Sequence, residues 1–223
     1  ILGASSLSIY SIPQQIAGKL SIISDALISV FLPKVSSTKS KKRNYEILNS
    51  NFYGFFYFVG LPLIIILPFV GKLIYWWLGD NANFQIIYLF KIFIIVSFYI
   101  CLTHVISTYL DSTFQSKKNF QLDTMILILF LCGIVICINL KEINYFAYLV
   151  LIKSIAAFLI KLRYLDKAIL NLKILIFQNI LFLIIFFFQI KGLNSFYILS
   201  LFLNLIIFIK NVPVDFLKKE FFK

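Results

Sequence analysis

The first apolar stretch of the chain, Leu7–Phe31, carries the polar and charged side chains best placed for chemistry. If it forms a helix, in which successive residues are about 100° apart, these side chains gather on one side. They are Ser8, Ser11, Gln14, Gln15, Gly18, Lys19, Ser21, Asp25 and Ser29. A membrane helix with a polar side of this length does not favour lipid all round. The pattern therefore predicts a helix that lines a water-filled cavity or a polar seam between helices.

Lys19 lies near the middle of this stretch, about 12 residues or 18 Å along a helix from either end. Its side chain is too short to bring the ammonium group to a membrane surface. Inserting such a charge costs about 2.5–3.5 kcal/mol, so water, a carboxylate or an anionic substrate must compensate it. Two interpretations remain open. Lys19 is paired within the protein, with Asp25 or a backbone carbonyl, or it faces a cavity and meets a substrate.

Two later stretches, Phe84–Leu110 and Ile143–Ile160, repeat this theme. The first contains His104, the only histidine of the chain, on one helical face with several hydroxyl side chains. His104 could carry a proton, or it could pack between helices as an ordinary polar residue. The second contains Lys153 beside a serine. The first, third and fifth apolar stretches are expected to cross the membrane in the same direction, and each contains a lysine. This arrangement favours a cationic cavity on one side of the bundle, and such a cavity would suit an anionic cargo.

The composition places these residues in a membrane protein. The chain is 61% hydrophobic and only 13% charged, whereas soluble domains are about 45–50% apolar and about 25% charged. Seven apolar stretches are each roughly long enough to cross a bilayer as a helix. They are Leu7–Phe31, Phe52–Trp76, Phe84–Leu110, Thr124–Ile138, Ile143–Ile160, Ile174–Ile190 and Ser195–Ile209. We expect an all-α, polytopic bundle of about seven transmembrane helices, forming one domain over residues 1–223.

The basic residues follow the connectors between these stretches. Fifteen of the 21 Lys and Arg residues lie in connectors on one side, three lie on the other side, and three lie within the stretches. This bias predicts that the richer side, which includes the C-terminus, faces the cytoplasm. In a soluble protein a net charge of +12 would suggest a nucleic-acid partner, but here topology explains the charge and we expect none.

The sequence contains no phosphate-binding glycine loop with its lysine, no histidine-rich cluster and no cysteine pair at metal-ligand spacing. We therefore expect no cofactor or metal and no enzymatic activity. Pro13, Pro62 and Pro68 lie inside apolar stretches, where proline removes a helical hydrogen bond and bends the helix. Such bends serve as hinges in some transporters and occur in static membrane helices too.

Three segments resemble the second half of polysaccharide flippases of the multidrug/oligosaccharidyl-lipid/polysaccharide exporter superfamily. The first is YSIPQQIAGKLSIISDALISVFLPKVS, from Tyr10 to Ser36, with a Tyr-containing start, a mid-helix Lys19 and a closing aromatic-x-Pro-Lys-x-Ser segment. The others are LIYWWLGDNANFQ, from Leu73 to Gln85, and STFQSKKNF, from Ser112 to Phe120. The resemblance covers about the first 120 residues, and the rest of the chain is similar only in hydropathy.

This resemblance implies the C-terminal lobe of a two-lobed transporter, together with a terminal helix pair. The family moves undecaprenyl-pyrophosphate-linked oligosaccharides from the inner to the outer leaflet of the bacterial cytoplasmic membrane. Its implied partners are this lipid-linked substrate, membrane lipid, the N-terminal lobe and a glycan polymerase. Lys19 and Lys153 would meet the pyrophosphate, and Gln14 and Gln15 would meet sugar hydroxyls. Asp25 or His104 would couple transport to protons or sodium.

Three other functions remain open. A drug or ion antiporter of the same superfamily would need an essential acidic residue in its cavity, for which Asp25 and Asp111 are the candidates. A membrane enzyme, such as a polymerase of surface glycan assembly, would ordinarily need a long external loop or a cluster of charged residues at one interface. A non-catalytic assembly subunit would not need the polar side of the first stretch.

Overall fold

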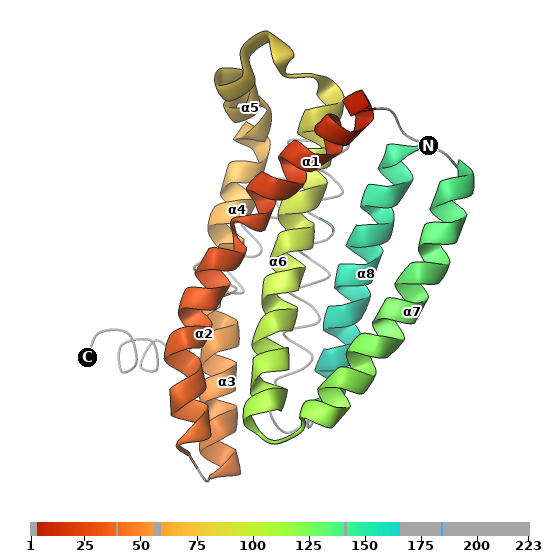
Figure 1. Cartoon of the computed structure of the whole chain (residues 1–223). Coiled ribbons are helices and arrows are strands. Elements are labelled where there is room, and N and C mark those ends of the chain that lie inside the picture. Colours follow the sequence, from red (N-terminus) through yellow and green to blue (C-terminus); the bar gives the residue numbers. More distant parts are fainter. Residues whose placement is uncertain (1–3, 39, 56–58, 141, 166–183, 185–223) are drawn as a thin grey trace.

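The computed structural model describes residues 4–38, 40–55, 59–140, 142–165 and 184, and the regular elements among them are all helices (Figure 1). The α-helices are α1 Ala4–Gly18, α2 Ser21–Ser36, α3 Lys41–Phe55, α4 Leu61–Ile66, α5 Val70–Leu78, α6 Phe84–Ser112, α7 Ser116–Leu140 and α8 Ile143–Tyr164. Two 3₁₀ turns, η2 Leu67–Phe69 and η3 Gly79–Asn81, flank α5. The expected all-α class is confirmed over this part of the chain.

Four segments of the described chain are long and apolar enough to cross a membrane. They are Leu7–Ser36, which combines α1 and α2, and Phe84–Ser112, Ser116–Asn139 and Ile143–Tyr164. They correspond to four of the seven predicted stretches. Two further stretches, Ile174–Ile190 and Ser195–Ile209, lie outside the described residues except for Ile184. The count of seven and the two-lobed arrangement therefore stay predictions.

Helix α6 is the centre of the bundle. About 72% of its most apolar window is buried within the protein, against 11% for α7, 17% for α8 and 18% for α1–α2. Helices α1, α2, α3, α5, α7 and α8 all contact α6. The other spans expose many large apolar side chains, such as Ile128 and Val135 on α7. Continuous exposed apolar surfaces of this kind are typical of helices that lie against lipid.

The first predicted stretch is interrupted between α1 and α2. The helix continues through Pro13, and the interruption falls later, at residues 19–20. There the backbone forms tighter i→i−3 hydrogen bonds, with 3.1 Å between the Lys19 nitrogen and the Ile16 oxygen. Figure 1 shows α1 inclined relative to α2 on either side of this point. The bend expected at Pro13 is thus displaced by more than one turn, and it lies at Lys19 itself.

The second predicted stretch, Phe52–Trp76, is not one continuous helix in the described structure. It is divided among α3, α4, η2 and α5. Pro62 lies in the first turn of α4, and Pro68 lies inside η2. Each proline lacks the N–H that a continuous α-helix would use, so the helix restarts or tightens there. The sequence predicted bends at these two prolines, and the structure shows changes of helix type there.

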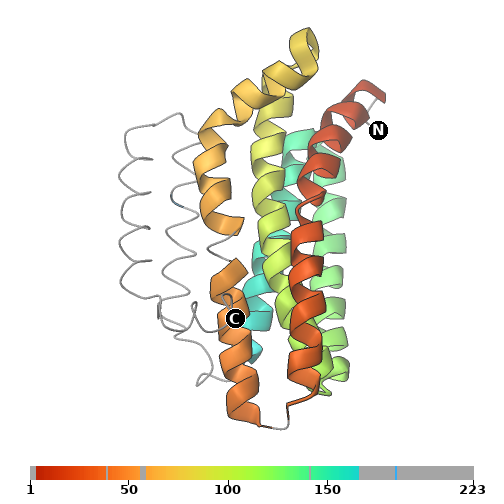
Figure 2. The ribbon, with the colours of Figure 1, turned by 90° about the vertical axis from the view of Figure 1, so that its left-hand side faces the viewer.

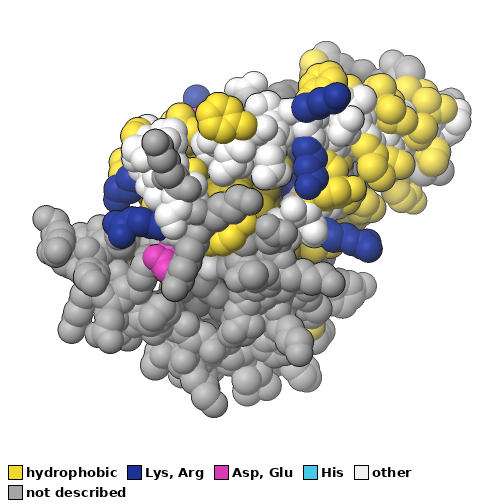
Figure 3. Space-filling view, turned by 90° about the horizontal axis from the view of Figure 1, so that it is seen from below, with side chains coloured by type: hydrophobic (Ala, Val, Ile, Leu, Met, Phe, Trp, Pro, Cys, Tyr) yellow, Lys and Arg dark blue, Asp and Glu magenta, His cyan; other side chains and the backbone are white. Residues whose placement is uncertain are grey.

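The ends of the helices separate the basic residues from the tryptophans. Helices α2, α6 and α8 end at one extremity of the bundle, and α3 and α7 begin there (Figures 1 and 2). Viewed onto this extremity, described Lys and Arg side chains gather across it (Figure 3). Trp76 and Trp77 are exposed near the other extremity, next to the turn between α5 and α6. The described helices thus reproduce the alternation of connectors expected from the sequence.

The close approach of α7 and α8 depends on Gly133. A Cβ added there would lie 2.3 Å from the Leu149 Cδ1 atom, so Gly133→Ala forces the Leu149 side chain to move. We expect this overpacking to lower stability by about 1–2 kcal/mol, measured as a lower midpoint of thermal unfolding in detergent. Gly71→Ala is the matched control, because its Cβ would meet only Ile87 at an ordinary 3.8 Å. The prediction fails if both variants unfold like the wild type, or if adding Leu149→Ala does not restore Gly133→Ala.

Candidate functional site

A polar cavity lies between α6, α7 and α8, with a volume of about 710 Å³. Its apolar lining consists of Ile100, Ile126, Leu127, Val150 and Ala157. Its polar lining consists of Thr103, His104, Ser107, Asp111, Asn119, Asp123, Lys153, Ser154 and Lys161. A cavity with this many ionisable groups, between helices able to span a membrane, is the strongest candidate for a functional site in the described chain.

The spacing of these residues explains why they meet. On α6, Thr103, Ser107 and Asp111 recur every fourth residue and therefore share one face. On α7, Asn119 and Asp123 have the same spacing. On α8, Lys153, Ala157 and Lys161 are also four residues apart, and the small Ala157 leaves room between the two lysines. The polar face of each of the three helices thus lines the cavity between them.

Lys161 is the most deeply buried charge of the cavity, with a side chain that is only 2% exposed. Its Nζ atom lies 2.6 Å from Asp123 Oδ1, and it donates hydrogen bonds to Ser107 Oγ at 2.7 Å and Asn119 Oδ1 at 2.9 Å. An ammonium group has three protons, and these three acceptors satisfy all of them. The charge is therefore fully compensated, and Lys161 joins α8 to α6 and α7.

Asn119 extends this network to a second carboxylate. Its Nδ2 group donates to both oxygens of Asp111, at 3.1 and 3.2 Å, while its Oδ1 accepts from Lys161. The amide can do both because it has separate donor and acceptor ends. Asp111, Asn119, Lys161 and Asp123 form one continuous chain of polar contacts, which we call the Lys161 network. A connected network of this kind holds its members in fixed positions.

Lys153 is the other cation of the cavity and differs from Lys161 in its surroundings. Its side chain is exposed, and its Nζ atom lies 4.5 Å from the centroid of the Phe130 ring. Among the described residues, no carboxylate lies within ion-pair distance of Lys153. A cation over an aromatic face is attracted to it but keeps its positive charge available. Lys153 therefore offers the cavity an uncompensated charge.

His104 and Asp25 connect the cavity to α2. His104 Nδ1 lies 3.4 Å from Asp25 Oδ1, and both side chains are at least half exposed. The pair becomes a salt bridge when the imidazole is protonated, and otherwise it is a polar contact between α6 and α2. The two residues named from the sequence as candidates for ion coupling are thus neighbours, although their role in coupling stays a prediction.

The remaining residues named from the sequence lie elsewhere. Lys19, Gln14 and Gln15 are exposed on α1 and at its junction with α2, and none of them lines the described cavity. Lys19 therefore does not share a described site with Lys153. The roles of Lys19, Gln14 and Gln15 in binding substrate stay predictions.

Lys161, Asn119 and Asp123 line the candidate site, although the sequence alone does not single them out. By its position in the sequence Lys161 belongs to a basic inner connector, whereas the structure places it inside α8 and buries it. One signal is present in the sequence. Lys153 and Lys161 are eight residues apart on α8, and Asn119 and Asp123 are four apart on α7, so each pair shares one helical face. The pairing of the two helices is not visible in either pattern.

Comparison with known proteins adds no family to this description. No protein-family model matches the sequence, and no curated protein or solved structure matches it either. The function must therefore be argued from the cavity, the charges around it and the membrane-spanning length of the helices that carry them.

The Lys161–Asp123 pair predicts an asymmetric response to substitution. Asp123→Ala leaves the buried Lys161 with two neutral acceptors, and we expect it to lower stability by about 2–3 kcal/mol. Lys161→Met keeps an unbranched apolar stem and leaves Asp123, whose side chain is 55% exposed, in contact with water. We expect this variant to lose at most about 1 kcal/mol.

The check is the midpoint of thermal unfolding of both variants in detergent, with the double variant closing the cycle. The double variant should be more stable than Asp123→Ala alone, because it no longer buries an unpaired ammonium group. A larger loss in Lys161→Met than in Asp123→Ala would contradict this description of the network.

Proposed function

We propose that this chain is part of a membrane transporter, and that the cavity between α6, α7 and α8 receives an anionic group of the cargo. The observation that carries the proposal is Lys153, a cation without a described carboxylate partner in a polar cavity between membrane-spanning helices. Ionisable residues in such positions are costly to insert, and they usually mark the path of a substrate or an ion.

Lys153 and Lys161 of α8 would have different roles. Lys161 has all its protons engaged, so it would shape the cavity and keep its wall together. Lys153 has only the Phe130 ring beside it, so an incoming anion would gain an ion pair without displacing a carboxylate. The hydroxyl groups of Thr103 and Ser154, which also line the cavity, would accept or donate hydrogen bonds to a polar headgroup.

The cargo class follows from the resemblance of residues 10–120 to polysaccharide flippases. On that basis the anionic group is the pyrophosphate of an undecaprenyl-linked oligosaccharide, which moves from the inner to the outer leaflet of a bacterial cytoplasmic membrane. The polar side of α1, with Gln14, Gln15 and Lys19, would face the sugar. The gathering of basic residues at one extremity supports a cytoplasmic position for that end. A cytoplasmic C-terminus rests on the charge bias of the connectors in the sequence.

The interruptions in the helices support a transporter that works by alternating access. Discontinuous helices are common at the substrate sites of secondary transporters. Here α1 and α2 are interrupted at Lys19, and the segment from α3 to α5 is interrupted at Pro62 and Pro68. In the proposed two-lobed protein, this chain would be the C-terminal lobe and would enclose the cargo together with the N-terminal lobe.

A second candidate is an ion-coupled antiporter of the same superfamily. The observation that favours it is the His104–Asp25 contact, because a histidine beside a carboxylate can take up and release a proton. The two candidates differ in which residue is essential. An antiporter of drugs or ions would depend on Asp25 and tolerate the loss of Lys153.

Lys153→Ala tests the proposed function. In bacteria whose surface glycan depends on the full-length protein, we expect this variant to reduce surface glycan by about 10- to 100-fold, because one charge-assisted contact to the cargo is lost. Lys153→Arg should retain most of the activity. Lys72→Ala is the matched control, since it removes an exposed lysine from α5, outside the cavity.

Immunoblots of the membrane fraction must show equal abundance of all these variants. Full activity of Lys153→Ala would overturn the role of Lys153 in cargo binding. If Lys153→Ala is active and Asp25→Asn is inactive, the antiporter becomes the better account.

A further inference from the structure

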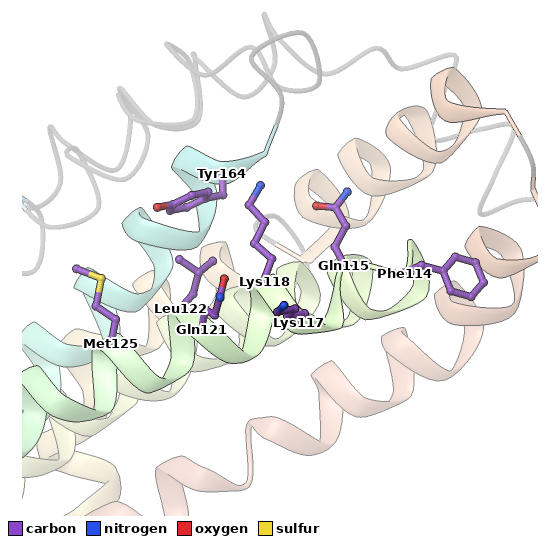
Figure 4. Close-up of a pocket in the computed structure, with 8 residues that line it drawn as sticks. All are labelled: Phe114, Gln115, Lys117, Lys118, Gln121, Leu122, Met125 and Tyr164. Atoms are coloured by element: carbon purple, nitrogen blue, oxygen red, sulfur yellow. The ribbon is translucent and has the colours of Figure 1, made fainter.

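A second pocket lies at the basic extremity of the bundle, between the α6–α7 turn and the end of α8 (Figure 4). It has a volume of about 540 Å³ and is lined by Phe114, Gln115, Lys117, Lys118, Gln121, Leu122, Met125 and Tyr164. Two lysines and two amides line it, and none of the described residues that line it is a carboxylate. The described residues that line this pocket differ from those that line the cavity between α6, α7 and α8.

The charge of this pocket is held in place by an aromatic ring. Lys118 Nζ lies 4.9 Å from the centroid of the Tyr164 ring, which joins α7 to α8. Figure 4 shows Lys118 and Gln115 rising toward the side on which Tyr164 lies. Lys117 is exposed beside them. Two cations with neighbouring amide donors are well suited to the oxygens of a phosphate group.

The pocket opens onto an apolar helical face. Met125 forms its edge. Leu129, four residues after Met125, and Ile136, seven residues after Leu129, follow on the same face of α7. Met125, Leu129 and Ile136 are all exposed. At the other end, Phe114 is 98% exposed and has a left-handed φ of 59°, and its ring points away from the other lining residues (Figure 4). Exposed aromatic side chains at the end of a membrane helix are typical of the headgroup region.

We infer that this pocket binds the headgroup of an anionic phospholipid. The phosphate lies between Lys117 and Lys118, and the acyl chains run along the exposed face of α7 that begins at Met125. The occupant must be both anionic and apolar, because the pocket is cationic and the surface that continues from it is suited to hydrocarbon. Basic pockets at the cytoplasmic ends of membrane helices bind anionic lipids in this manner. The inference does not depend on the proposed transport activity.

Lipid binding by the purified full chain tests this inference. In detergent, native mass spectrometry would count phosphatidylglycerol molecules that stay bound, with phosphatidylcholine as the neutral comparison. We expect preferential binding of phosphatidylglycerol, and we expect Lys117→Ala/Lys118→Ala to weaken it about 30-fold. Lys117→Arg/Lys118→Arg should retain binding, which also shows that the pocket tolerates substitution.

The matched control is Lys34→Ala/Arg43→Ala, which removes two charges at the same extremity, one from the last turn of α2 and one from the first turn of α3. It should bind phosphatidylglycerol like the wild type. An equal loss in this control would show that only the general positive charge of the surface matters, and would overturn the site. Displacement of the lipid by millimolar inorganic phosphate, or equal binding of phosphatidylcholine, would also overturn it.

Discussion

The ammonium group of Lys161 imposes a constraint on which the arrangement of α6, α7 and α8 depends. A buried charge is tolerated only when polar partners replace the water it has lost. Ser107 on α6 and Asn119 and Asp123 on α7 supply these partners, at distances of 2.6 to 2.9 Å. Since each acceptor comes from a different position on two helices, Lys161 is satisfied in only one relative placement of the three. The same contacts keep a polar space open between helices whose other faces are apolar.

Compensation of Lys161 also determines what remains available in the cavity. Asp123 is engaged by Lys161, and Asp111 is engaged by Asn119, so both carboxylates have partners within the network. Lys153, two turns earlier on α8, has only an aromatic neighbour. The cavity therefore combines one end, where the charged groups are engaged with partners inside the protein, with another end, where Lys153 has no carboxylate partner among the described residues. The proposal of an anionic cargo rests on this second end. The central position of α6, which most other helices contact, fixes His104 and Ser107 with respect to that cation.

Much of the fold could be predicted from the sequence, and the site could be predicted only in part. Four of the seven spans predicted from apolar runs are found in the described chain, because such runs act locally. The prolines Pro62 and Pro68 predicted bends, and the helix type changes near both of them. The interruption at Lys19 was not predicted, since residues 18–20 carry no proline. Lys153 and His104 were named because they lie deep within apolar runs. Lys161 was not named as a site residue, because a lysine one turn from a helix end ordinarily extends to the surface. Only the pairing of α7 with α8, which is a tertiary feature, shows that its charge is buried.

The central claim is that water and polar solutes enter the space between α6, α7 and α8 while the outer face of α7 meets lipid. Thiol labelling in intact membranes with a charged, membrane-impermeant reagent tests it most directly. Thr103→Cys, in a chain whose three native cysteines are replaced by alanine, should react, since Thr103 lines the cavity. A chain retaining only Cys132, which is exposed on α7, should not react. An unreactive Thr103→Cys variant, together with a reactive Cys132 in the other chain, would contradict the account.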